Sequence, residues 1–129
     1  MNKRILAYAV IILSVVYFYS SESYASDEWT YEYCTISANS AGAYLQDRFD
    51  GMTLSEVIEA ERVRLSSRQR KLAPGISQEE AVNRILKMNM PEILAAYDQR
   101  YSDNPSEQAK IKRHFVDQFL SKCLKENLR

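Results

Sequence analysis

Residues 29–49 read WTYEYCTISANSAGAYLQDRF, and this stretch decides the fold class. Eight of its residues recur at steps of three or four and would share one face of an α-helix: Trp29, Tyr33, Ile36, Ser37, Ala41, Tyr44, Leu45 and Arg48. Gly51 follows at the place where glycine commonly ends a helix. We therefore predict a helix over residues 29–49. Its run of small residues between Ser37 and Ala43 would let a neighbouring helix approach closely.

Three further helix starts follow along the chain. Thr53-Leu-Ser-Glu56 and Ser77-Gln-Glu-Glu80 are capping boxes, in which a hydroxyl and a carboxylate satisfy the first backbone amides of a helix. The first of these helices should run to about residue 71. Asn104-Pro105-Ser-Glu107 combines an N-cap with proline in the first turn and should start a last helix ending near Asn127.

Pro91 interrupts the third helix, because proline has no backbone N–H to donate. We expect a kink or a short break there, with a separate helix over residues 91–101 as the alternative. Four or five amphipathic helices joined by short loops predict an all-α fold, a small antiparallel bundle.

The N-terminal segment has the layout of a secretory signal peptide. Cations at Lys3 and Arg4 precede an apolar stretch over residues 5–19, and Ser23-Tyr24-Ala25 supplies small residues at the cleavage site. We predict a signal peptide over residues 1–25 and a single helical domain over residues 26–129, located in the periplasm or secreted. An uncleaved membrane anchor is the alternative, and it would be the chain's only membrane contact.

Two cysteines, Cys34 and Cys123, stand near the two ends of the predicted domain. In an oxidising compartment they should form a disulfide that pins the first helix to the last. Closing so long a loop stabilises the fold by about 4–5 kcal/mol in the loop-entropy model. A free thiol, an intermolecular bridge and a redox role are the alternatives.

Charge and motifs exclude several functional classes. Without Lys3, Arg4 and Glu22, the 17 cations and 17 anions of the chain become 15 and 16, which argues against a nucleic-acid-binding protein. The sequence has no nucleophile elbow, zinc-protease motif or phosphate loop. A zinc site built on Cys34, His114 and Cys123 would lack a fourth protein ligand. We therefore predict no enzyme activity, no metal site and no cofactor.

Two groups of side chains leave alternatives open. Acids on the second predicted helix should be solvated, although a carboxylate pair for glycoside cleavage could come from among Glu56, Glu59 and Glu61. Tyrosines at helical spacing favour core positions over contacts with a partner, at Tyr33, Tyr44 and Tyr97.

Five cations lie within ten residues near the end of the second predicted helix: Arg62, Arg64, Arg68, Arg70 and Lys71. They would offset the helix dipole and pair with Glu59 and Glu61. Alternatively, they form a docking site for an acidic partner, an anionic lipid or a cell-wall polymer.

The order of Cys34, small residues, Arg48-Phe-Asp-Gly51, Ala95-Ala-Tyr97, Phe115 and Cys123 resembles a pattern found in small exported helical proteins of Gram-negative bacteria and their phages. More distantly, the chain is similar to the periplasmic immunity proteins that neutralise type VI secretion amidases. The resemblance implies a small exported helical protein, and it assigns no inhibitory residue.

These observations favour a non-enzymatic periplasmic binding protein, an inhibitor or immunity factor for a cell-wall-targeting enzyme, with a protein partner. A cell-wall hydrolase or its accessory is the first alternative. A structural or stress-related envelope component, dimeric through a tyrosine-rich face, is the second.

Overall fold

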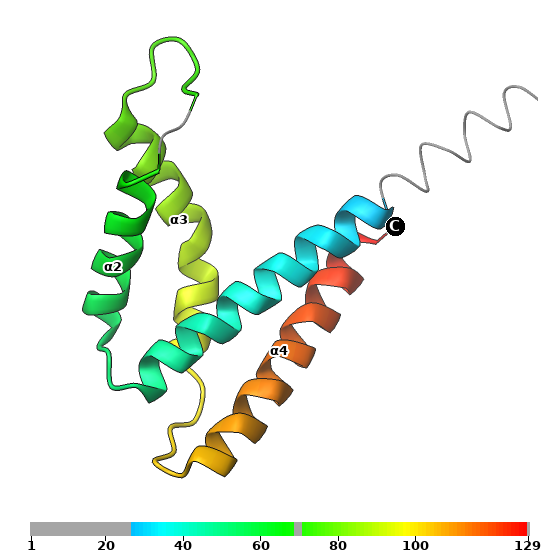
Figure 1. Ribbon diagram of the computed structural model, residues 1–129. Helices are drawn as coiled ribbons and strands as arrows, with labels where there is room; N and C mark the ends of the chain where they lie inside the picture. The colour runs from blue at the N-terminus through cyan, green and yellow to red at the C-terminus, as the bar shows by residue number, and fades with distance from the viewer. Residues whose placement is uncertain (1–26, 69–70, 129) are drawn as a thin grey trace, which may run out of the picture.

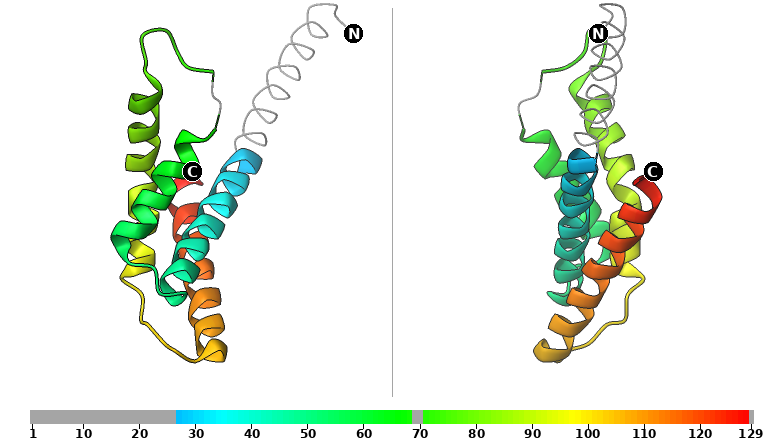
Figure 2. Two further views of the ribbon diagram at one scale, coloured as in Figure 1. Left: turned by 60° about the vertical axis from the view of Figure 1, so that its left-hand side comes forward. Right: turned by 90° about the vertical axis from the view of Figure 1, so that its right-hand side faces the viewer.

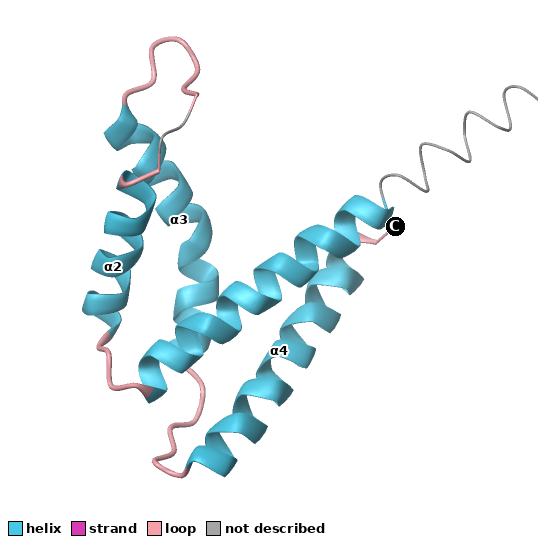
Figure 3. Ribbon diagram, in the orientation of Figure 1, coloured by secondary structure: helices cyan, strands magenta, loops and turns pink. Residues whose placement is uncertain are grey.

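The computed structural model describes residues 27–68 and 71–128, and within these ranges it contains four α-helices and no strand (Figure 3). The first helix spans residues 27–49, and α2 (Leu54–Ser66), α3 (Gln78–Tyr97) and α4 (Pro105–Asn127) follow. The predicted all-α class is confirmed, and four helices fit a small bundle. The predicted signal segment, residues 1–25, lies outside the described part of the chain.

The helices form two antiparallel pairs (Figure 1). α2 and α3 pack against each other as a hairpin, and α4 runs alongside the first helix in every view (Figures 1 and 2). The end of α4 therefore lies next to the start of the first helix. Of the helices described, none combines the length and the apolar composition that crossing a membrane requires.

A disulfide joins these two ends of the chain. Cys34 in the first helix is bonded to Cys123 in α4, with their Cα atoms 5.6 Å apart, so the predicted pairing is confirmed. Neither cysteine is free, and the Cys34 side chain is fully buried. The bond closes a loop with a sequence separation of 89 residues.

The first helix packs on α4 through its small residues. A side-chain carbon added at Gly42 would lie 2.7 Å from Cγ2 of Val116, closer than two carbon atoms can pack. Ala38 and Ala41 are also buried in this helix. The close approach expected from the run of small residues is therefore confirmed.

The buried face of the first helix differs from the predicted stripe at its start. Trp29, Tyr33 and Ile36 are 67%, 46% and 59% exposed, so placing Tyr33 in the core was wrong. Cys34 and Ala38 are buried instead, because the helix turns its small side chains toward α4. From Ser37 onward the predicted positions are buried as expected, at Ser37, Ala41, Tyr44 and Leu45.

Local chemistry sets the ends of the helices. The first helix ends where Gly51 adopts a φ of 92°, with the amide of Met52 donating to the carbonyl of Asp47 at 3.0 Å. The predicted capping box at Thr53 and Glu56 opens α2. The hydroxyl of Ser77 likewise accepts a hydrogen bond from the amide of Glu80 at 3.1 Å at the start of α3.

One predicted boundary was wrong, because α2 ends at Ser66, five residues before the expected residue 71. α3 runs through Pro91 to Tyr97 as one helix, so the short break and the alternative helix over residues 91–101 are not found, whereas a kink at Pro91 stays a prediction. Ile93 and Ala96 are fully buried beyond the proline, so tertiary packing holds this half of α3 helical. α4 begins and ends as predicted, with Asn104 as its N-cap.

Arg48 ties the first helix to the end of α3. Its guanidinium donates to the backbone carbonyls of Ala96, at 3.4 Å, and of Gln99, and it lies 5.8 Å from the ring centre of Tyr97. The hydroxyl of Tyr97 donates to the carbonyl of Met52 at 2.8 Å. A cation at the carbonyl end of a helix also offsets the helix dipole. This end of the bundle is therefore fixed by polar contacts, and the opposite end by the disulfide.

The core lies where the four helices meet. It contains Phe49, Val57, Leu86 and Phe115 together with these other buried residues: Ala41, Tyr44, Leu45, Leu65, Val82, Ile93 and Ala96.

Replacing both Cys34 and Cys123 by serine should lower the free energy of unfolding by about 2–5 kcal/mol, because the unfolded chain regains the freedom that the long loop removes. Chemical denaturation of the variant and of the oxidised wild type measures this loss. Equal midpoints would show that the disulfide does not stabilise the fold.

Gly42→Val should destabilise the protein by about 1–3 kcal/mol, because the added side chain overlaps Val116. Ala43→Val is the matched control, since residue 43 is exposed on the same helix and carries only the lower helix propensity of valine. If both variants unfold at the same denaturant concentration, the first helix and α4 are not in close contact at Gly42.

Candidate functional site

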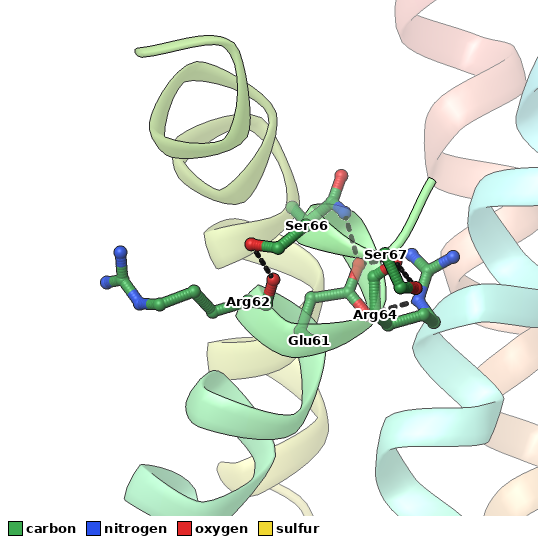
Figure 4. Close-up of polar contacts among 6 residues, drawn as sticks. Glu61, Arg62, Arg64, Ser66 and Ser67 are labelled. Atoms are coloured by element: carbon green, nitrogen blue, oxygen red, sulfur yellow. Dashed lines mark hydrogen bonds and ion pairs between the residues drawn. The ribbon is translucent and has the colours of Figure 1, made fainter. Parts of the chain in front are cut away.

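Glu61 is a buried charged residue on α2, with 5% of its surface exposed. Its carboxylate accepts two hydrogen bonds from Arg64, one of them from Nε at 2.7 Å, and a third from Nδ2 of Asn89 on α3 at 2.9 Å. In Figure 4, Arg64 lies on the side of α2 that faces the first helix, whereas Arg62 extends away from it. The expectation that Glu61 is solvated was therefore wrong, while Glu56 and Glu59 are exposed as predicted.

The partners of Glu61 decide its charge. Burial works to raise the pKa of Glu61, but the hydrogen bonds and positive charge of Arg64, with smaller contributions from Asn89 and Tyr44, leave it below the usual value. Tyr44 in the first helix responds oppositely, because burial and the neighbouring Glu61 carboxylate raise the pKa of its hydroxyl. The cluster therefore pairs the negative charge of Glu61 with the positive charge of Arg64, and Asn89 and Tyr44 connect it to α3 and to the first helix.

The predicted basic segment does not form one patch on a helix. Only Arg62 and Arg64 lie on α2. Arg62 donates to Oδ1 of Asn83 at 2.8 Å and lies 3.6 Å from Glu59, as the dipole-and-pairing interpretation expects. Arg68 and Lys71 are exposed in the connection to α3, and Arg70 lies outside the described residues. A role of these cations in partner binding stays a prediction.

A groove of about 480 Å³ lies between the first helix, α3 and α4. Its walls are mixed in character: Met88 and Pro91 from α3 and Phe115, Phe119 and Cys123 from α4 are apolar, and polar side chains from the same helices lie among them. The rings of Phe115 and Phe119 meet edge to face, with their centres 6.0 Å apart.

Glu92 and Ser37 bring polar groups into this groove. The hydroxyl of Ser37 donates to the carboxyl group of Glu92, which is only partly exposed. Burial raises the pKa of Glu92, the bond from Ser37 opposes this, and the charge of Glu61 adds to the rise. A partly buried carboxyl group without an ion pair among the described residues therefore lies in this groove.

A stacked aromatic pair lies at the edge of the groove. Tyr33 lines the groove, and the ring of Trp29 stacks on it with centres 5.6 Å apart and planes 7° from parallel. Ile36 is exposed one turn further along the same helix. Exposed aromatic side chains of this kind are typical of binding surfaces.

Glu61 and Glu92 do not form the carboxylate pair of a glycoside hydrolase. Their pKa values are shifted in opposite directions, as in an acid and base pair. However, Glu61 does not line the groove, and Arg64 and Asn89 occupy its oxygens. His114 is exposed on α4. Within residues 27–68 and 71–128, no three side chains gather that could hold a metal ion.

Neither the groove nor Glu92 was predicted from the sequence. One signal was available, because Pro91-Glu92 places the one charged residue of the stretch over residues 90–97 directly after a proline. The pairing with Ser37 could not be inferred, since 55 residues separate the two.

Glu92→Gln should stabilise the protein at neutral pH. The pKa of Glu92 is raised in the folded protein above its ordinary value of 4.5. Ionisation of Glu92 therefore destabilises the fold as the pH rises from 4.5 through the raised pKa. Glutamine keeps an acceptor for Ser37 and removes this loss. Charges that face Glu92 are Glu61 from α2 and, around the groove, Lys122 and Glu126 from α4.

Glu61→Gln should have the opposite effect. The pKa of Glu61 is lowered in the folded protein, so the ionised carboxylate stabilises the fold, and this stability is lost as the pH falls through the lowered pKa. At pH 7 this variant should lose about 1.5–3 kcal/mol, the usual value of a hydrogen bond to a charged group. Urea denaturation of both variants between pH 4 and pH 8 tests the pair. A loss of stability in Glu92→Gln at pH 7 would contradict the assignment for Glu92.

Comparisons with known proteins add no relative: no protein-family model, no curated protein and no solved structure matches this chain.

Proposed function

We propose that this chain is a non-enzymatic binding protein that docks a protein partner through the groove and the Trp29–Tyr33 pair. The observation that carries this proposal is an open groove, lined by both apolar and polar side chains, whose edge bears two stacked and exposed aromatic rings. Such rings bury a large area at little cost in side-chain entropy, which is why they dominate binding energies at interfaces.

The construction of the groove also supports binding. Its walls come from three helices, and Cys123 of the disulfide is one of the lining residues. A covalent bond between two of these helices keeps their separation fixed before a partner arrives. Binding sites held in this way lose less conformational entropy when a complex forms.

The disulfide also indicates a compartment outside the reducing cytoplasm. The periplasm, reached through a cleavable signal peptide, is the location we propose. Within this setting an inhibitor or immunity factor for a cell-wall-targeting enzyme is the specific function we favour. Its support is the combination of small size, a disulfide-fixed bundle and the resemblance to exported helical proteins.

A second candidate function follows from the exposed face of the first helix. Trp29, Tyr33 and Ile36 lie on one face, and a second copy of the chain could cover it. The protein would then be a dimeric component of the cell envelope. Sedimentation of the purified protein over a range of concentrations distinguishes this candidate, which requires reversible self-association.

Tyr33→Ala and Trp29→Ala should each reduce partner capture at least about tenfold, because aromatic anchors at interfaces commonly contribute more than 1.4 kcal/mol. The measurement is crosslinking and affinity purification of the tagged protein from the envelope fraction, with partners identified and quantified by mass spectrometry. Tyr31→Ala is the matched control, because Tyr31 is an exposed tyrosine on the same helix that does not line the groove.

One stoichiometric partner, lost in both variants and kept in the control, would support the proposed function. A partner captured equally by all three variants would exclude the groove edge as its docking site. Charge reversal at Arg68 and Lys71 tests the basic segment in the same assay. Neither residue has an ion pair within the described part of the chain, so this change leaves the Glu61 cluster intact.

A further inference from the structure

Glu92 is the one acidic side chain of α3 that lines the groove. It is partly buried, and its contact is the Ser37 hydroxyl, which is neutral. Among the ion pairs of the described residues, none includes Glu92. A carboxylate that has lost part of its water and has gained no cation is left with unfavourable desolvation, which an arriving cation would offset.

In the structure no neighbouring cation forms an ion pair with Glu92. Lys122 also lines the groove, but its Nζ lies 4.0 Å from Oε1 of Glu126, one turn further along α4. Glu61 adds a negative charge near Glu92 from the α2 side. The acidic side chains around the groove therefore outnumber the basic ones, and a basic ligand fits its charge.

The walls beside Glu92 suit a long apolar stem. Pro91, Phe119 and Tyr33 line the same groove, and each offers carbon surface rather than charge. Lysine and arginine bury their methylene groups along such surfaces while their charged tips reach a polar partner. Aromatic faces also attract a cation held close to them.

We propose that the groove binds a lysine or arginine side chain of the protein partner, with its cation paired to the Glu92 carboxylate and its stem between Pro91, Phe119 and Tyr33. This inference rests on the proposed function and adds the chemistry of the partner. It reverses the expectation drawn from the basic segment, which pointed to an acidic partner. The anchor is a single basic residue presented by the partner at the centre of the interface.

The test uses two probes with the same stem. n-Hexylamine carries a cation on an apolar chain, and 1-hexanol carries a neutral hydroxyl. Each is titrated into the oxidised full-length protein at pH 7 and followed by NMR at the amides of Ser37, Glu92 and Phe119. We expect the amine to bind roughly tenfold more tightly than the alcohol, because it alone forms a charge pair in a partly dry site.

Glu92→Gln should abolish this preference, and Glu126→Gln should leave most of it. Glu126 is the matched control, since it is an acid of the same groove that already pairs with Lys122. In the wild type the preference should disappear when the pH falls far enough to protonate Glu92. Equal affinities of the two probes for the wild type, or an unchanged preference in Glu92→Gln, would overturn the inference.

Partner capture with the same variant separates the two proposals. If the wild type captures a partner and Glu92→Gln does not, both the proposed function and the basic anchor are supported. Capture that depends on Trp29 and Tyr33 but survives in Glu92→Gln overturns the basic anchor and leaves the proposed function standing. If no partner depends on Trp29 or Tyr33, the proposed function fails, and the two probes still decide whether Glu92 holds a cation. Because this variant should gain stability at pH 7, its loss of binding would not reflect unfolding.

Discussion

The contact between the first helix and α4 is the constraint on which the rest of the structure depends. Gly42 leaves just enough room for Val116, and the Cys34–Cys123 disulfide holds the two helices together near their other ends. α3 packs against this pair, where Ile93 is fully buried and Met88, Pro91 and Glu92 form the third wall of the groove. A chain with larger side chains on this face of the first helix could not form the same groove.

The residues that carry the resemblance to small exported proteins have structural roles in this chain. Arg48 and Tyr97 bind the two loops at one end of the bundle, Gly51 ends the first helix, and Phe115 lies in the core. The two cysteines fix the opposite end. A pattern made of such residues specifies how the helices are joined and leaves the groove free to differ. In this chain the pattern therefore describes how the helices are joined, and it identifies no partner.

The parts of the fold that sequence predicted are those set by neighbouring residues. Caps at Thr53 and Asn104 and the glycine end at Gly51 depend on a few adjacent side chains, and each is found where expected. The buried face of the first helix was predicted wrongly at its start, because the apolar side chains of Trp29 and Ile36 suggested core positions. The apolar character of a side chain does not show whether another helix packs against it. Close helix packing selected the small side chains instead.

The candidate site was beyond prediction for a related reason. Glu61 is buried because Arg64 and Asn89 satisfy its charge, and Asn89 belongs to a different helix. Glu92 gained its importance only when Ser37 and Phe119 came to lie beside it. These environments combine residues far apart in the chain, and local spacing carries no information about them.

The walls of the groove come from opposite ends of the described chain, and this has a consequence for synthesis. Tyr33 and Ser37 leave the ribosome well before Phe119 and Cys123. A nascent chain that has not yet produced α4 cannot form the groove, however long its earlier part has had to fold. Such a chain lacks both one wall of the groove and the cysteine that bonds to Cys34. The groove is therefore a property of the assembled helices, and no single part of the chain forms it alone.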